Sequence, residues 1–301
     1  MVPLRLVSSY FVLQGFAIAA WWAMLWFDPR SIGWFFPKAW NPDSFLSFWL
    51  ADLVLLSLGS LLVAFGVYQK QLWASTAAWS LAVTSWYPTL YCLAVSFKTG
   101  EAWVASAMMI VMGGGGVAMA SMISHGGQDP NAFRVTSMKG AILWWSTAGQ
   151  IVLFWGTFLV VIPLGVVEVQ GGLGVPCFSH RWQLPASTSL LTLASGLGLW
   201  SAISMVKSGG GTPLPMAQAP RLVISGPYRL IRNPMAVAGI LQAVSVGWLL
   251  GSVPVIGYAL MGIIIWNRFV RPTEEADLFR RFGQSYEEYR SRVRLWIPCG
   301  K

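Results

Sequence analysis

Charged side chains stand at both ends of an apolar stretch near the C-terminus of this 301-residue chain. Guanidinium and carboxylate groups in that position could bind a polar ligand, because a guanidinium grips a carboxylate through two parallel hydrogen bonds. The alternative is that the acids cap a helix and the arginines carry surface charge. The side chains in question are Arg229, Arg232, Arg268, Arg271, Glu274 and Glu275.

The first two of these arginines precede a proline that is well placed to begin a helix. Arg229 and Arg232 are three residues apart, which is a helical spacing and predicts guanidiniums in neighbouring directions if a first turn has already begun. Pro234 suits the opening turn of the next helix, because its missing N–H is not needed there. The N–H groups that follow would form a helix end that favours an anion.

The segment after the apolar stretch predicts an amphipathic helix. Pro272 and Thr273 mark its expected start, and Glu274 and Glu275 fall in its first turn, where the helix dipole favours acids. Gly283 is predicted to divide the helix into two segments. Apolar residues recur at three- and four-residue spacing. They would place the helix against the cytoplasmic end of the helical hairpin that the apolar stretch is expected to form. This stripe consists of Leu278, Phe282, Tyr286 and Tyr289.

Many separate elements of this region occur in the order of a known pattern. Residues 187–301 resemble the isoprenylcysteine carboxyl methyltransferase and phospholipid methyltransferase family of integral membrane enzymes. The order joins a basic turn braced by proline, an apolar hairpin split by Gly251-Ser252 and an acidic-basic tail, which a simple membrane anchor would not need. The matching positions are Gly226-Pro227-Tyr228-Arg229, Arg232, Pro234-Met235, Glu274-Glu275, Leu278, Phe282-Gly283, Tyr286, Tyr289 and Ile297-Pro298.

The resemblance implies a site for S-adenosylmethionine between the 226–235 loop, the hairpin and the tail helix, with a lipophilic acceptor entering sideways from the bilayer. Methyl transfer from a sulfonium needs no metal and no covalent enzyme intermediate, so no metal site is expected. It needs the acceptor atom, the methyl carbon and the sulfur held in line, with water excluded. The residues implied to bind the cofactor are Tyr228, Arg229, Arg232, Asn233, Pro234, Met235, Glu274 and Tyr286, and those implied to be catalytic are Arg268, Arg271 and Glu275.

Two positions depart from the family pattern. It usually reads R-H-P-x-Y where this chain has Arg232-Asn233-Pro234-Met235-Ala236. Asn233 can donate and accept hydrogen bonds, but it cannot carry a proton as histidine does. Ala236 lacks the phenol altogether. Because the rest of the frame is intact, the departures bear on detailed contacts and on catalysis rather than on which cofactor is expected.

The composition independently indicates a membrane protein. Hydrophobic residues make up 55% of the chain and charged residues 10%, and apolar runs of about 20 residues recur, each long enough to cross a bilayer. We expect an all-α, polytopic bundle of eight transmembrane helices followed by a cytoplasmic amphipathic helix. Residues 1–184 would form an accessory bundle and residues 185–301 the methyltransferase-like region. The expected spans are 7–27, 45–68, 73–97, 102–123, 138–166, 187–206, 235–250 and 253–269.

The distribution of lysine and arginine predicts the orientation of these spans. Only Arg30, Lys38, Lys98 and Arg181 face one side, and the other sixteen of the 20 basic residues face the side that carries both termini. Basic loops stay in the cytoplasm, so we expect both termini there, in a bacterial plasma membrane. The net charge of +9 is therefore mostly a topology signal. No soluble basic face with base-stacking groups is present, which argues against nucleic acid as a partner.

Several features of the first half have ordinary explanations. The glycine run at 113–116 lies inside the fourth span, where close helix packing through small residues is preferred over a phosphate-binding loop. Asp52 is an acid inside an apolar span, and we favour a structural role over substrate contact. The three cysteines are widely spaced and form no metal pattern. His125 and His180 lie on opposite sides of the expected membrane, so they cannot form one site.

Two other functions stay open. A membrane reductase of the steroid- or sterol-reductase kind, which would bind NADPH, has a similar C-terminal tail, although the G-P-Y-R, R-N-P-M, E-E and F-G frame fits the methyltransferases better. A non-catalytic scaffold or transporter that kept the fold is consistent with the altered Asn233 and Ala236. The acceptor is not decided by the sequence. A prenylcysteine carboxylate, a lipid amine and another lipophilic O, N or S atom all fit.

Overall fold

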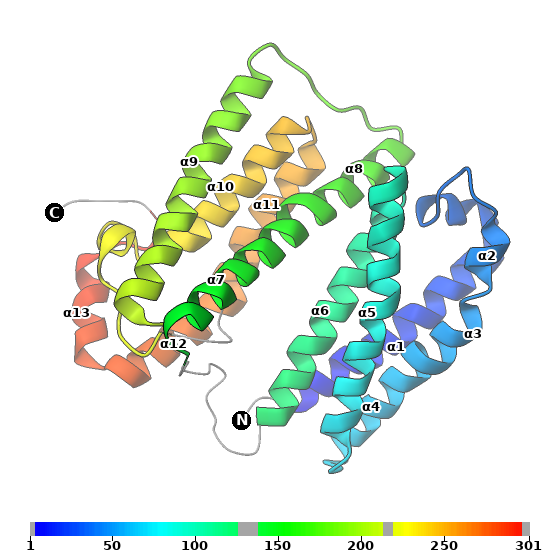
Figure 1. Cartoon of the computed structure of the whole chain (residues 1–301), viewed down its shortest axis with the longest axis horizontal. Coiled ribbons are helices and arrows are strands. Elements are labelled where there is room, and N and C mark those ends of the chain that lie inside the picture. Colours follow the sequence, from blue (N-terminus) through cyan, green and yellow to red (C-terminus); the bar gives the residue numbers. More distant parts are fainter. Residues whose placement is uncertain (1–3, 126–137, 213–218, 297–301) are drawn as a thin grey trace. The chain divides into compact units, whose positions relative to one another are not determined.

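The computed structural model describes residues 4–125, 138–212 and 219–296, and these ranges contain helices and turns but no strand (Figure 1). The predicted all-α class is confirmed. The chain forms two compact units. Unit 1 holds the described residues up to 125 together with Leu164–Leu173, and unit 2 holds residues 138–163 and the described residues from 174 onward.

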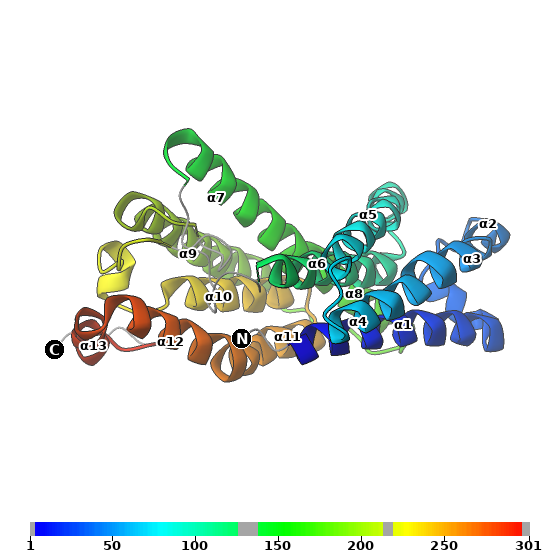
Figure 2. The same cartoon turned by 90° about the horizontal axis from the view of Figure 1, so that it is seen from below.

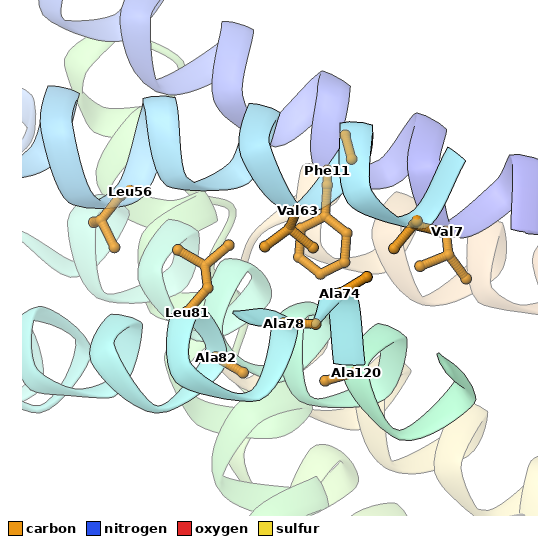
Figure 3. Packing of buried hydrophobic residues seen from close by; sticks show 11 residues of the cluster. Val7, Phe11, Leu56, Val63, Ala74, Ala78, Leu81, Ala82 and Ala120 are labelled. Atoms are coloured by element: carbon orange, nitrogen blue, oxygen red, sulfur yellow. The ribbon is translucent and has the colours of Figure 1, made fainter. Parts of the chain in front are cut away.

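Unit 1 is a bundle of helices from the first half of the chain. Its elements are α1 (Leu4–Phe27), η1 (Pro29–Trp34), α2 (Pro42–Leu46), α3 (Trp49–Ala51), the π-helical η2 (Asp52–Leu58), α4 (Gly59–Tyr68), α5 (Ala74–Thr99), α6 (Trp103–His125) and most of α8 (Ile162–Gly172). Helix α1 packs against α4 and α6, and α5 packs along α4 and α6. Phe11 of α1, Val63 of α4 and Ala78 of α5 meet in the buried core (Figure 3).

Two features of unit 1 that stood out in the sequence, Asp52 and the glycine run, take part in helix packing. The indole N–H of the fully buried Trp22 donates to Asp52 Oδ2 at 3.2 Å, and this contact between α1 and η2 agrees with a structural role for this acid. Helix α6 continues through the glycine run, and Gly115 lies so close to the phenol of Tyr10 that a side-chain carbon would collide with it. The close packing predicted for this glycine run is therefore confirmed at Gly115, whereas a side-chain carbon on Gly114 would meet open space.

Unit 2 carries the region with the motif. Its elements are α7 (Gly140–Trp155), η3 (Gly156–Val161), α9 (Gln183–Ser204), η4 (Met205–Gly209), the 3₁₀ helix η6 (Gly226–Arg229), α10 (Pro234–Leu249), α11 (Val253–Ile265), the π-helical η7 (Trp266–Val270), α12 (Arg271–Phe282) and α13 (Gln284–Arg292). Helix α9 packs along α10, and α10 packs along α11 (Figure 1). Leu159, Ala243 and Ala259 form a buried cluster between η3, α10 and α11.

A tight turn at Gly251-Ser252 joins α10 to α11. Gly251 has a φ of +64°, and a side-chain carbon on it would collide with the Phe178 carbonyl oxygen, so only glycine fits. Its own carbonyl accepts the Phe178 N–H at 2.8 Å. The hydroxyl of Ser252 accepts the Val255 N–H at 3.3 Å and caps α11. The predicted helical hairpin is therefore present.

The described helices include enough apolar length for several membrane crossings. Helix α5 has 26 residues, but its serines and threonines make it less apolar than the others, and two further apolar helices, Pro234–Leu249 and Val253–Arg268, are shorter. All eight segments expected to span the membrane are largely helical, with a turn at residues 47–48 inside the second, which agrees with a polytopic bundle. The five helices long and apolar enough by themselves are Arg5–Phe27, Pro42–Tyr68, Trp103–Ile123, Gly140–Gly172 and Gln183–Gly209.

The tail continues the hairpin directly. Helix α11 passes through η7 into α12 without a break, so the separate helix start predicted at Pro272-Thr273 is wrong. A proline has no N–H to donate to the helix, and the wider π-helical turn just before it accommodates the shifted hydrogen bonds. Gly283, with a φ of +48°, separates α12 from α13 as predicted.

Candidate ligand-binding site

One carboxylate in unit 2 forms ion pairs with three guanidinium groups. Glu275 of α12 accepts a hydrogen bond from Arg232 Nη1 at 3.1 Å, and it lies 3.4 Å from Arg271 Nε and 3.9 Å from Arg290 Nη2. These four residues, which we call the Glu275 cluster, come from the segment before α10, from α12 and from α13. The Arg232 and Glu275 side chains are only 14% and 17% exposed, so salt screens this pair weakly.

The Glu275 cluster carries more positive than negative charge. Three guanidiniums share one carboxylate, and the buried Nε of Arg232 has no hydrogen-bond partner among the residues that the structure describes. A buried donor without a partner is destabilising, and surplus cationic groups attract an anion. The cluster therefore has the chemistry to bind a carboxylate or another small anion.

Backbone contacts hold Arg232 in place. Its N–H donates to the Arg294 carbonyl at 2.9 Å, which ties the end of the described tail to this segment. The side-chain oxygen of Asn233 accepts the Ala236 N–H at 3.0 Å and caps α10. Pro234 is the first residue of that helix, as predicted. Asn233 thus positions the start of α10 directly beside the cluster.

The turn before Arg232 packs closely against α9. Gly226 has a φ of +59°, and a side-chain carbon on it would collide with the Ser204 hydroxyl of α9, so glycine is required there. Tyr228 is buried behind it and packs with Ala219 and Val223. The 226–229 turn is therefore held by α9 on one side and by the preceding segment on the other.

Arg229 and Arg232 do not share a helical face, so that prediction is wrong. Arg229 ends η6 and is exposed, whereas Arg232 lies between η6 and α10 and is largely buried. The backbone leaves the helix between them, because the Arg232 N–H bonds the distant Arg294 carbonyl instead of a carbonyl one turn back.

The other predicted site residues surround the cluster to different degrees. Met235 lies partly buried in the first turn of α10. Arg268 is exposed on η7, and within the described chain the ion pairs of Glu275 are with the three other arginines. Arg290 was not among the site residues predicted from the sequence. Its four-residue spacing from Tyr286, a member of the apolar stripe, was the available signal.

The tail is fastened to the turn by tyrosines and an ion pair. Tyr286 is 2% exposed, and the Tyr289 hydroxyl donates to the Tyr228 carbonyl at 2.7 Å. Arg281 pairs with the buried Asp277 at 2.8 Å and donates to a backbone carbonyl of the segment before η6, also at 2.8 Å. Of the predicted stripe, Tyr286 is therefore buried and Tyr289 contacts the turn that precedes the hairpin.

Burial shifts the proton affinity of groups beside the cluster. Desolvation, together with the neighbouring carboxylates of Glu275 and Asp277, raises the pKa of Glu274 to about 7, and Arg281 opposes this shift. Burial also raises the pKa of Tyr286, which keeps this phenol neutral near pH 7. Shifted acids gathered around charged partners are characteristic of ligand sites.

We expect Glu274 to make the protein less stable as the pH rises from about 5 to about 8. Because its pKa in the folded state, about 7, lies above the ordinary 4.5, the folded protein binds more protons in this window, and that stabilisation is lost as the pH passes the folded pKa. The melting temperature of Glu274→Gln relative to wild type should therefore increase with pH, and an unchanged difference would contradict the assignment. Glu288→Gln, at an exposed position on α13, should show no such trend.

Some predicted features lie outside the described residues, and no metal site is found within them. The described ranges contain no group of three or more His, Cys, Asp or Glu side chains placed to hold a metal. The features outside them are Ile297 and Pro298 of the motif, Cys299, and the basic residues Arg134 and Lys301.

Comparisons with known proteins match this same region. Residues 184–285 match the family model described as phospholipid methyltransferase. A segment of 79 residues is 37% identical to the Protein-S-isoprenylcysteine O-methyltransferase of Schizosaccharomyces pombe, and it covers 26% of this chain and 33% of that protein. The chain thus spans about a third of the length of this curated relative. No solved structure matches the chain. The resemblance predicted from the motif is confirmed for this region.

Proposed function

We propose that this protein is an integral membrane methyltransferase that transfers a methyl group from S-adenosylmethionine to a lipophilic acceptor. The observation that carries the proposal is the Glu275 cluster, which stands at the end of the α10–α11 hairpin. Arg232, Arg271 and Glu275 lie inside the region that matches the family, and Arg290 lies just beyond it. Residues 185–301 would form the methyltransferase region, and residues 1–184 would form an accessory bundle.

The cluster suits the amino-acid end of S-adenosylmethionine, which carries a carboxylate and an ammonium group. Arg232, with its buried Nε unpartnered among the described residues, would bind the carboxylate. Glu274 would accept a hydrogen bond from the ammonium group. The positive charge of the ammonium would lower the pKa of Glu274 from about 7 and so favour its carboxylate form. When bound, this cofactor supplies an electrophilic methyl group on sulfur.

The other site residues would orient the reacting groups and exclude water. Because methyl transfer needs no covalent intermediate with the protein, holding the groups in line and excluding water are the main contributions expected of the site. Arg268, Arg271 and Glu275 would orient the acceptor. The residues proposed to line the cofactor with Arg232 and Glu274 are Tyr228, Arg229, Asn233, Pro234, Met235 and Tyr286.

The acceptor would enter from the bilayer between helices. The name of the fission-yeast protein makes a prenylated cysteine carboxylate the first acceptor to test, and the name of the matching family makes a lipid amine the second. We place the Glu275 cluster and both termini on the cytoplasmic side of a bacterial plasma membrane, because the basic segments gather on that side.

Calorimetry on the detergent-solubilised full chain tests the cofactor assignment. S-adenosylmethionine and its demethylated product should bind with micromolar affinity, in the range of enzyme substrates. Absence of both heat and thermal stabilisation at millimolar ligand would contradict the proposal. The same protein titrated with NADPH separates the classes, since stabilisation by NADPH alone would favour the reductase, and stabilisation by neither ligand would favour a non-catalytic membrane protein.

A further inference from the structure

Helix α12 exposes apolar residues, whereas its acidic residues are buried or partly buried. Pro272, Ala276 and Phe279 are exposed, Phe279 to 53%. Asp277 is buried, and Arg280 is the one exposed charged residue among the described side chains of α12. A helix that faces water carries its polar residues on the outer side. The outer face of α12, defined here as Pro272, Ala276 and Phe279, therefore has the wrong polarity for water.

The outer face of α12 continues the exposed line of α11. The two helices run on from one another through η7 (Figure 2), and exposed positions recur every three or four residues along their whole length. On α11 these positions are apolar and suit contact with lipid. The line consists of Val253, Gly257, Leu260, Ile264, Arg268, Pro272, Ala276 and Phe279.

Helix α13 provides an internal contrast. Its exposed side chains are polar, and they include Gln284, Glu287, Glu288 and Arg292, as expected of a helix in water. The change from an apolar to a polar outer face occurs at Gly283, where the chain changes direction. The boundary between lipid contact and water is thus marked within the tail itself.

We propose that the outer face of α12 binds the anionic surface of the surrounding bilayer. Phe279 would sit at the boundary between headgroups and acyl chains, at a depth of about 5–10 Å, while Arg280 near the C-terminal end of the face would contact lipid phosphates. The Glu275 side chain lies on the flank of this helix, one turn before Phe279, and is only 17% exposed. The Glu275 cluster would therefore lie level with the headgroups. On the proposed function, that is where a lipophilic acceptor would present its polar end.

A fluorescent label at Phe279→Cys tests this placement without cofactor or activity. The background carries serine in place of Cys92, Cys177 and Cys299, and the full chain is placed in nanodiscs of phosphatidylcholine with phosphatidylglycerol. We expect loss of fluorescence when the lipids carry a nitroxide on the upper acyl chain, and little loss with iodide in the water. A label at Glu288→Cys should behave in the opposite way. Ala276→Cys replaces Phe279→Cys if that variant does not fold.

Each other outcome overturns a stated part of the proposal. Quenching of the α12 label by iodide to the same extent as at position 288 would place the outer face in water. Protection from both quenchers would mean that protein, such as a second copy, covers it. Nanodiscs of phosphatidylcholine alone, or Arg280→Gln in the mixed lipid, should reduce the nitroxide quenching at position 279, and an unchanged signal in both would overturn the role of anionic lipid.

Discussion

Glu275→Gln is expected to destabilise the protein by about 1.5–3 kcal/mol, because it removes the one charged acceptor shared by three guanidinium groups. The three arginines would then repel one another across α12, α13 and the segment before α10. The unfolding temperature should fall, and methyl transfer should slow, because Arg232 and Arg271 lose the group that orients them. Thermal unfolding and the initial rate of methyl transfer measure the two effects.

A matched substitution separates the cluster from ordinary surface charge. Glu287 also pairs with Arg290, at 4.0 Å, but its side chain is 51% exposed, and exposed pairs contribute little to stability. Glu287→Gln should therefore leave the unfolding temperature and the rate near those of wild type. If Glu275→Gln methylates as fast as wild type and unfolds at the same temperature as Glu287→Gln, the cluster has no special role.

Arg232→Lys is expected to weaken binding of S-adenosylmethionine about ten- to a hundredfold although the charge is kept. Lysine supplies a point charge and cannot form two parallel hydrogen bonds to a carboxylate, so one charge-assisted contact of about 1.5–3 kcal/mol is lost. Folding should survive, because the backbone bond from residue 232 to the Arg294 carbonyl does not depend on the side chain. Calorimetry on both proteins gives the two affinities.

Arg292→Lys provides the control for this substitution. Arg292 is exposed on α13, and its replacement should leave cofactor affinity unchanged. An alternative role for Arg232 is to anchor the start of α10 at the headgroups, where lysine would serve equally well. Affinities of Arg232→Lys and wild type that agree within about twofold, with both proteins folded, would decide for the anchor.

The helices could be predicted from the sequence because each carries its own local signal. Long apolar runs identify the spans, Pro234 identifies the start of α10, and Gly283 identifies the break in the tail. Pro272 misled, because a proline near a helix start and a proline just after a π-helical turn look the same in sequence. Which carbonyl each N–H bonds in such a turn depends on packing against the neighbouring helices.

The pairing inside the site was harder to predict, because it is not local. Arg232 and Glu275 were both singled out by the motif, but they are 43 residues apart. Their contact depends on the lengths of α10 and α11, because the two helices must bring both residues to the same end of the hairpin. The inward position of Arg232 depends on a backbone bond to Arg294, which no local pattern indicates. The outward apolar line of α12 is, in retrospect, visible in the spacing of Ala276 and Phe279.

The most direct test of the central claim is methyl transfer itself. The purified full chain in nanodiscs, supplied with S-adenosylmethionine labelled on its methyl group and with a prenylated cysteine, should yield a labelled lipophilic product, and Glu275→Gln should yield it more slowly. If the label enters neither this acceptor nor any lipid extracted with the protein, while wild type still binds the cofactor by calorimetry, the protein is not the methyltransferase proposed here.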